Sequence, residues 1–127
     1  ELLEVTVVDH PTRVHAVAGA TLLFLHGEAN TWAWSTIHDE LAANFTVYAP
    51  VHPGFGGEEL PPWLYDVSDI SFHNAALVTQ LGIEQPLVLG VSLGGWLALD
   101  LAAHRPDLTC ALLAVGSLGI RPVAPMP

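Results

Sequence analysis

The sequence predicts an α/β fold in which a mostly parallel sheet has helices on both faces. Short apolar runs alternate along the chain with longer segments whose apolar residues keep helical spacing. Gly, Pro or Asn residues mark most changes from one kind of segment to the other. Such alternation favours parallel strands joined by crossover helices, and 127 residues suffice for a single domain over residues 1–127.

An N-terminal hairpin is expected before the parallel part begins. Residues 2–8 and 13–18 are rich in β-branched residues and partly alternate in polarity, and the turn signal DHPT lies between them. We therefore expect an antiparallel pair of strands at the start of the chain.

The parallel part is expected to hold four strands and three helices. The apolar runs that predict the strands lie at residues 21–27, 45–50, 86–91 and 109–116. The segments with helical spacing lie at residues 31–44, 68–81 and 93–104. Asn30 or Thr31 is expected to cap the first helix, Gly82 to end the second and Pro106 to stop the third. Ligand sites in such sheets gather at the carboxyl ends of the strands.

The composition excludes several classes of partner. The net charge is −10 with only three basic residues, so the chain lacks the cations that nucleic-acid binding requires. An anionic membrane surface is disfavoured for the same reason. No apolar run reaches the roughly 18 residues of a spanning helix, and no leader pattern is present, so we expect a cytoplasmic protein. No motif calls for a metal or a cofactor.

The segment LVLGVSLGGW, residues 87–96, predicts a serine exposed on a tight turn between a strand and a helix. Small residues must flank such a serine; Gly90 and Gly94 meet that demand, and Gly95 is expected to let the helix lie close to the sheet. The N–H of Leu93 points toward a developing oxyanion, and the positive end of the helix adds to its stabilisation. Ser92 is therefore the expected nucleophile.

Four stretches, in this order, resemble the N-terminal half of proteins with the α/β-hydrolase fold: LLFLHG, YAPVHPGFGG, LVLGVSLGGW and LALDLAAHRPD. The resemblance covers nearly the whole chain and is strongest to the branch with a PxHPGFG loop. The chain departs from the family pattern at Val91, where His is frequent, at Val51, where Asp is frequent, and at Glu58, where Ser is frequent. These differences concern loop packing and substrate fit and leave the nucleophile unchanged.

The resemblance implies further parts of a site. The loop after the third strand supplies the second oxyanion N–H, here from Glu28 or Ala29. Haloalkane dehalogenases and epoxide hydrolases of this superfamily carry Asp at the turn, so Ser92 disfavours those chemistries. Four aromatic residues in or beside the strand-end loops are candidates for an apolar acyl pocket, although ordinary packing explains each one equally well: Trp32, Trp34, Phe55 and Trp63.

The acid and the base of a Ser–His–Asp triad are missing from their usual places. In this fold they follow the serine along the chain, and the residues after Ser92 offer only Asp100, His104 and Asp107. At 1.5 Å per residue, His104 lies roughly 18 Å along its helix from the active end, and Asp107 lies at that same far end. His26, at the end of the strand at 21–27, is a candidate substitute base, although the resemblance implies a loop-organising role for it.

Two explanations of the incomplete triad stay open. We favour a chain that is part of a longer serine hydrolase, with the lid and the last strands elsewhere. The alternative is a short protein that completes its site through a partner chain or a substitute base. In both cases the strand at 109–116 is an apolar edge of the kind that pairs with other chains. We therefore expect a homo-oligomer joined through this sheet edge, unless a missing C-terminal half covers it.

Hydrolysis of a small carboxylic ester through an acyl-Ser92 intermediate is the function that these residues favour, which would make the protein a carboxylesterase of the α/β-hydrolase type. One alternative is a carbon–carbon bond hydrolase that acts on a diketone-like substrate with the same turn and oxyanion loop. The other is a catalytically incomplete module that binds a small apolar ligand or a partner chain.

Overall fold

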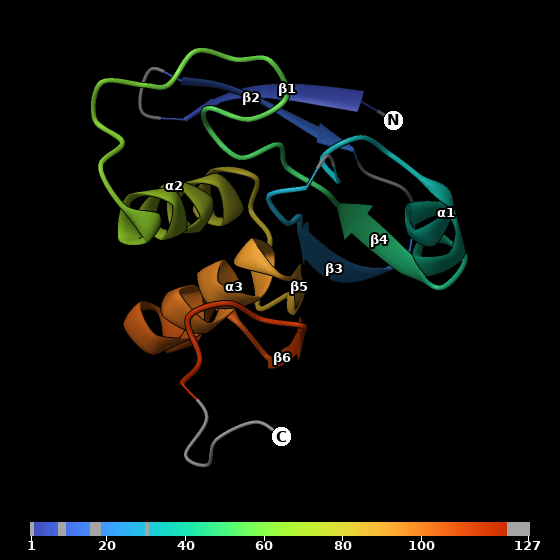
Figure 1. The fold of residues 1–127 in the computed structure, drawn as a ribbon. Helices are drawn as coiled ribbons and strands as arrows, with labels where there is room; N and C mark the ends of the chain where they lie inside the picture. Colours follow the sequence, from blue (N-terminus) through green and yellow to red (C-terminus); the bar gives the residue numbers. More distant parts are fainter. Residues whose placement is uncertain (1, 8–9, 16–18, 30, 122–127) are drawn as a thin grey trace.

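A computed structural model describes residues 2–7, 10–15, 19–29 and 31–121 of the chain (Figure 1). Four parallel strands form the central sheet, in the spatial order β4–β3–β5–β6. These strands are β3 (Ala20–Leu25), β4 (Phe45–Tyr48), β5 (Leu87–Val91) and β6 (Ala111–Val115). The expected α/β architecture with a parallel sheet is thus confirmed.

Two further strands precede the central sheet and form a sheet of their own. β1 (Leu2–Val7) pairs antiparallel with β2 (His10–His15). The pair lies beside α2 and β4, at the top of the view in Figure 1. The expected ends of these strands at residue 8 and at residues 16–18 lie outside the described residues.

Three helices cover the two faces of the central sheet. They are α1 (Thr36–Ala42), α2 (Val67–Gln80) and α3 (Leu93–His104). α2 and α3 lie side by side on one face, and α1 lies on the other (Figure 1).

The core divides in the same way because successive residues of a strand face opposite sides. Leu23 and Leu25 of β3 pack with α2 and α3, whereas Leu22 and Phe24 pack on the side of α1. All four side chains are buried, so β3 is covered on both faces, as its apolar sequence predicts.

The start of α1 corrects the sequence prediction. Residues 31–35 lie outside the helix, and Ser35 is the N-cap residue, with its N–H donating to His38 Nδ1 at 3.0 Å. Thr31 is therefore not the cap, and Asn30 lies outside the described residues. A side chain at the third helical position thus decides where the helix begins, which apolar spacing alone does not show.

The ends of α2 and α3 follow local signals. Asp66 caps α2, since its Oδ1 accepts from the N–H of Asp69 at 3.1 Å, and the helix begins one residue before the expected Ser68. Gly82 ends α2 with a φ of 68°, as expected. Pro106 follows α3 and opens a short 3₁₀ turn, Pro106–Leu108.

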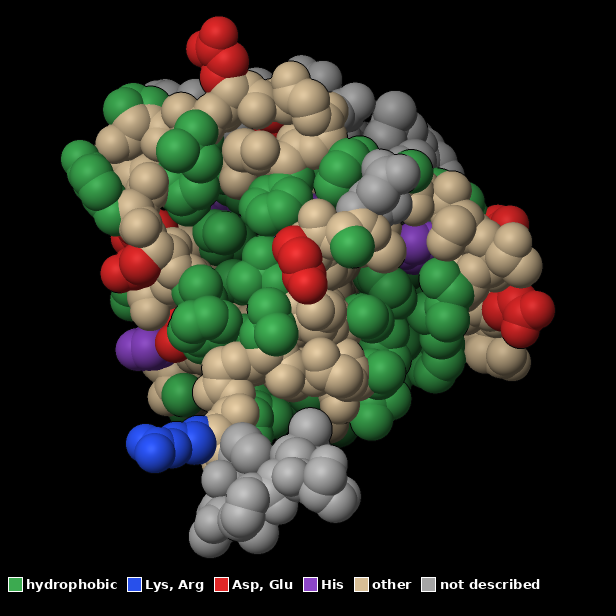
Figure 2. All heavy atoms as spheres, in the orientation of Figure 1, with side chains coloured by type: hydrophobic (Ala, Val, Ile, Leu, Met, Phe, Trp, Pro, Cys, Tyr) green, Lys and Arg blue, Asp and Glu red, His purple; other side chains and the backbone are tan. Residues whose placement is uncertain are grey.

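β6 lies at one end of the central sheet, and within the described part of the chain no strand pairs with its outer edge. Leu113 and Val115 of this strand are 56% and 47% exposed. Hydrophobic side chains cover much of the molecular face seen in Figure 2, with acidic side chains among and around them. Self-association through this edge stays a prediction.

The described residues include no helix that combines the length and the apolar character needed to cross a bilayer. Nor do His, Cys, Asp and Glu side chains converge anywhere in these residues in a group of three that could hold a metal ion.

Candidate functional site

Ser92 occupies a strained backbone conformation between β5 and α3, with φ at 55° and ψ at −115°. A non-glycine residue in this region costs about 1–3 kcal/mol and persists only where its surroundings hold it. The Ser92 N–H donates to the carbonyl of Val115 at 2.9 Å, and the Ser92 carbonyl accepts from Gly95 N at 3.0 Å and Leu118 N at 3.1 Å. The turn is thus held from both sides, by α3 and by the loop after β6.

Three glycines allow the backbone segments around Ser92 to approach one another. A Cβ on Gly90 would overlap the Gly94 carbonyl, and a Cβ on Gly94 would overlap the carbonyl of Leu25 in β3. A Cβ on Gly95 would come within 2.7 Å of Ser117 Oγ. Gly94, rather than the expected Gly95, therefore permits the close packing of α3 on the sheet, and Gly95 admits the loop after β6.

The carboxylate of Glu28 lies directly against the serine. Ser92 Oγ donates to Glu28 Oε1 at 2.9 Å, and the N–H of Leu93 donates to Glu28 Oε2 at 3.2 Å. The proximity of its own backbone N–H, followed by the hydrogen bonds from Ser92 and Leu93, holds the pKa of Glu28 below its ordinary value. One carboxylate therefore receives hydrogen bonds from the serine hydroxyl and from the N–H of Leu93, which is expected in an oxyanion hole.

From the sequence, Glu28 was expected to contribute only its backbone N–H to the oxyanion hole. The contact of its side chain with Ser92 was not predicted. No local signal could have revealed it, because the donors come from a turn 64 residues further along the chain. Ala29, the other candidate for the second N–H, is exposed next to Glu28.

His26 and His52 form a buried pair beside this turn, with ring centroids 3.8 Å apart. His26 Nε2 accepts from the N–H of His52 at 2.9 Å, so the ring proton lies on Nδ1, 2.7 Å from the carbonyl oxygen of Gly27. His52 Nε2 donates to the carbonyl of His26 at 3.0 Å. Burial lowers the pKa of His26 and lowers that of His52 well below its usual range.

This geometry gives His26 the loop-organising role that the resemblance implies. Both of its ring nitrogens are engaged with backbone groups, which leaves no free nitrogen to accept the proton of Ser92. Its use as a substitute base stays a prediction that the geometry does not favour.

Two of the four candidate pocket aromatics gather around His26. The ring of Phe55 lies 5.4 Å from that of His26, the ring of Trp32 lies 6.1 Å from it, and the two aromatic rings are 6.4 Å apart. Both side chains are half-buried. They are the aromatic groups that the structure places beside the loop carrying Glu28.

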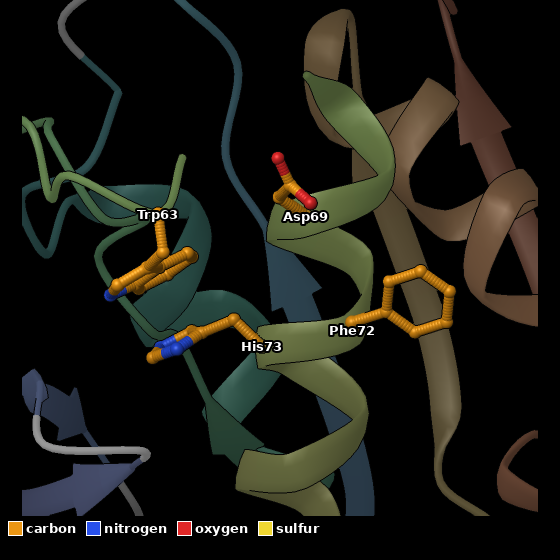
Figure 3. A pocket seen from close by; sticks show the side chains of 4 residues that line it. All are labelled: Trp63, Asp69, Phe72 and His73. Atoms are coloured by element: carbon orange, nitrogen blue, oxygen red, sulfur yellow. The ribbon is translucent and has the colours of Figure 1, made fainter. Parts of the chain in front are cut away.

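The other two aromatics pack elsewhere. Trp34 stacks on His38 of α1, and its Nε1 donates to Asp39 Oδ1 at 2.7 Å. Trp63 stacks on His73 of α2, as Figure 3 shows, with ring centroids 5.7 Å apart.

Trp63 also lines a surface pocket of about 240 Å³. The other residues that line this pocket all belong to α2: Asp69, Phe72 and His73 (Figure 3). Neither Ser92 nor Glu28 is part of the lining. A role of Trp34 and Trp63 in an acyl pocket stays a prediction.

Asp100, His104 and Asp107, the candidate acids and base after Ser92, lie toward the opposite end of α3. His104 Nδ1 is 3.5 Å from Asp100 Oδ1, and Arg105 pairs with Asp107 at 2.8 Å. His26, His52 and His104 thus have other hydrogen-bond partners, and none of these three bonds to Ser92. The acid and the base that would activate Ser92 thus stay unassigned among the described residues.

Comparison with known proteins identifies the relatives of this chain. The family model described as "Alpha/beta hydrolase family" matches residues 22–127. The chain is 33% identical to the 2-hydroxymuconate semialdehyde hydrolase of Pseudomonas sp. (strain CF600), over 92% of the chain and 44% of that protein. It is also 33% identical to the pimeloyl-[acyl-carrier protein] methyl ester esterase of Yersinia pseudotuberculosis, over 76% of the chain and 36% of the esterase.

Solved structures also resemble this chain. The epoxide hydrolase CorEH superposes with a TM-score of 0.85 at 27% identity, over the whole chain and 46% of CorEH. The chain therefore spans less than half the length of each of these three relatives.

Proposed function

Because the chain belongs to the α/β hydrolase family, we propose that the protein is a serine hydrolase that acts on small carboxylic esters. Ser92 Oγ attacks the ester carbonyl carbon, the alcohol leaves, and water then cleaves the acyl-Ser92 intermediate. The N–H groups of Leu93 and Glu28 stabilise the oxyanion. The proton of Ser92 passes to a histidine, which in the triad order of this fold follows the serine and the acid along the chain. We place this enzyme in the cytoplasm.

One observation carries the proposal: the hydroxyl of Ser92 and the N–H of Leu93 converge on the same carboxylate. A carboxylate resembles the acid that ester hydrolysis releases, and its oxygens carry negative charge as the oxyanion does. The N–H of Leu93 is therefore suitably aimed to bind a carbonyl oxygen as it becomes negative, and the hydroxyl of Ser92 lies beside it, where it can attack the attached carbon. The strained φ of Ser92 supports the same role, since strain of this kind collects at functional sites.

The first alternative is a carbon–carbon bond hydrolase, which the similarity to 2-hydroxymuconate semialdehyde hydrolase favours. By its name, the substrate of that relative is a semialdehyde that retains one carboxylate. The second alternative is a module that binds a ligand or partner without turnover, which the lack of a bond from His26, His52 or His104 to Ser92 favours. Epoxide opening is less well supported, because the turn carries Ser92 in place of Asp.

Turnover of p-nitrophenyl acetate tests the proposal. We expect Ser92→Ala to abolish p-nitrophenolate release above the rate of the uncatalysed reaction, since the nucleophile is lost. Ser117→Ala is the matched control, because it removes a hydroxyl from the neighbouring loop that, among the described residues, bonds only to the Leu118 carbonyl. Its rate should stay within about twofold of the unmodified protein.

Mass spectrometry then locates the intermediate. After a short exposure to the ester, the peptide that contains Ser92 should gain one acetyl group in the unmodified protein and in Ser117→Ala. Unchanged rates in Ser92→Ala, together with no acetylation of this peptide, would refute the proposed function.

A further inference from the structure

The Glu28 carboxylate occupies the position that a substrate carbonyl needs. Its two oxygens accept from Ser92 Oγ at 2.9 Å and from Leu93 N at 3.2 Å. A substrate must therefore displace this carboxylate before its carbonyl oxygen can reach the N–H of Leu93 and its carbonyl carbon can approach Ser92 Oγ.

The displaced carboxylate cannot move far from the reacting atoms. Glu28 directly follows His26 and Gly27, whose positions are fixed by burial and by the hydrogen bonds between the two buried histidines. A Cβ on Gly27 would lie 3.2 Å from Ser92 Cβ, so the backbone just before Glu28 touches the serine. The negative charge of Glu28 thus stays beside the bound acyl group even after the side chain has swung away.

Nothing basic in the described side chains neutralises this charge. Of the three arginines in a chain that has no lysine, Arg105 pairs with Asp107 at the far end of α3. Arg121 follows the loop after β6, and its side chain is exposed without a salt bridge to Glu28. The third, Arg13, lies on β2, outside the side chains that the structure describes.

We propose that Glu28 is a specificity-determining residue that makes the Ser92 site select neutral esters and reject substrates with a carboxylate near the scissile carbonyl. This inference rests on the proposed ester hydrolysis and deepens it by naming the charge of the acyl group. It also separates that function from its first alternative, because 2-hydroxymuconate semialdehyde, the substrate named for the relative, carries a carboxylate.

Two p-nitrophenyl esters of similar size test the selectivity: p-nitrophenyl butyrate, which is neutral, and mono-p-nitrophenyl succinate, which carries a carboxylate. The measured quantity is the ratio of kcat/KM for the neutral ester to that for the anionic ester. We expect Glu28→Gln to lower this ratio about tenfold, chiefly by raising kcat/KM for the succinate, because two like charges no longer meet near the serine. Glu59→Gln removes an equal charge from an exposed loop and should leave the ratio unchanged.

A binding measurement decides the question even without turnover. The amide resonance of Leu93 is followed by NMR while butyrate or butyramide is added. Butyrate should bind Glu28→Gln about tenfold more tightly than the unmodified protein, and butyramide should bind both about equally.

The outcomes distinguish the two proposals. Ester turnover that is independent of Ser92 refutes the proposed function, and the butyrate titration then still decides the role of Glu28. Ser92-dependent turnover with the same selectivity ratio in Glu28→Gln refutes the role of Glu28 and leaves ester hydrolysis standing. Equal binding of butyrate to both proteins also refutes the role of Glu28.

Discussion

The two faces of the central sheet are built from the same strands but are covered very differently. On one face α2 and α3 lie side by side, and Leu23, Leu25 and Val88 are at most 1% exposed (Figure 1). On the other face α1 covers the part of the sheet near β3 and β4. Exposure there rises from 4% at Phe24 to 56% at Leu113, two residues of one cross-strand row.

An apolar groove of about 260 Å³ marks the uncovered part of the second face. It is lined by Leu22, Leu41, Phe45, Leu87, Val88, Leu89, Ala111, Leu112 and Leu113. The sequence of β6, ALLAV, is as apolar as that of β3, ATLLFL. An apolar run thus predicts a strand, but how many of its faces are covered depends on helices that only the fold places.

The largest effect is expected where the covered face is most tightly packed. Gly94→Ala places a Cβ on the carbonyl of Leu25, so α3 must move away from the sheet. We expect the free energy of unfolding to fall by about 4 kcal/mol or more, which is exceptional for one methyl group. Urea unfolding followed by circular dichroism measures it.

Gly116→Ala is the matched control for this prediction. Gly116 has a positive φ of 55°, which Gly94 does not have, but a Cβ there meets no atom within 4 Å. The cost should be only about 1 kcal/mol, from backbone strain alone. Equal losses in the two variants would show that close packing at Gly94 is not what holds α3 on the sheet.

Substitution of two neighbouring leucines of β6 compares how much each face of the sheet contributes to stability. Leu112 points toward the side of α2 and α3 and packs against their core, whereas Leu113 points toward the open side and is 56% exposed. Leu112→Ala should lower the free energy of unfolding by about 2 kcal/mol, and Leu113→Ala by less than about 1 kcal/mol. Equal losses, measured by urea unfolding, would mean that the second face is covered in solution.

Much of the fold could be predicted from the sequence because its signals are local. The alternation of apolar runs with helical spacing gives the parallel sheet, and the glycines around Ser92 give the strained turn. The end of α2 at Gly82 could also be predicted, because glycine adopts a positive φ easily and this depends on that residue alone.

The parts that the sequence did not reveal depend on groups far apart in the chain or on a single side-chain bond. The side chain of Glu28 finds its donors only when β3 and β5 come to lie side by side. The hydrogen bond between Ser35 and His38 fixes the start of α1, although the apolar spacing of residues 31–34 predicts an earlier start. The pairing of His26 with His52 likewise needs the loops after β3 and β4 to meet.

The smallest of the expected effects concerns these two histidines, which are buried beside the covered centre of the sheet. Burial lowers the pKa of both rings, so both are neutral in the folded protein at neutral pH. In the unfolded chain each ring takes up a proton near its ordinary pKa of about 6.5. The unfolded state therefore binds more protons below this pH, and stability that is fully present above about pH 6.5 is lost as the pH falls.

Urea midpoints measured at about pH 7.5 and about pH 5.5 test this, with an expected loss of roughly 1 kcal/mol for each pH unit below 6.5. His52→Gln removes the more deeply buried of the two titrating rings and should reduce the loss, whatever its own effect on stability at pH 7.5. His104→Gln is the control for replacing a histidine as such, because His104 is exposed on α3 and lies outside the buried pair. A loss that persists in His52→Gln but disappears in His104→Gln would place the acid sensitivity at the far end of α3, outside the buried pair.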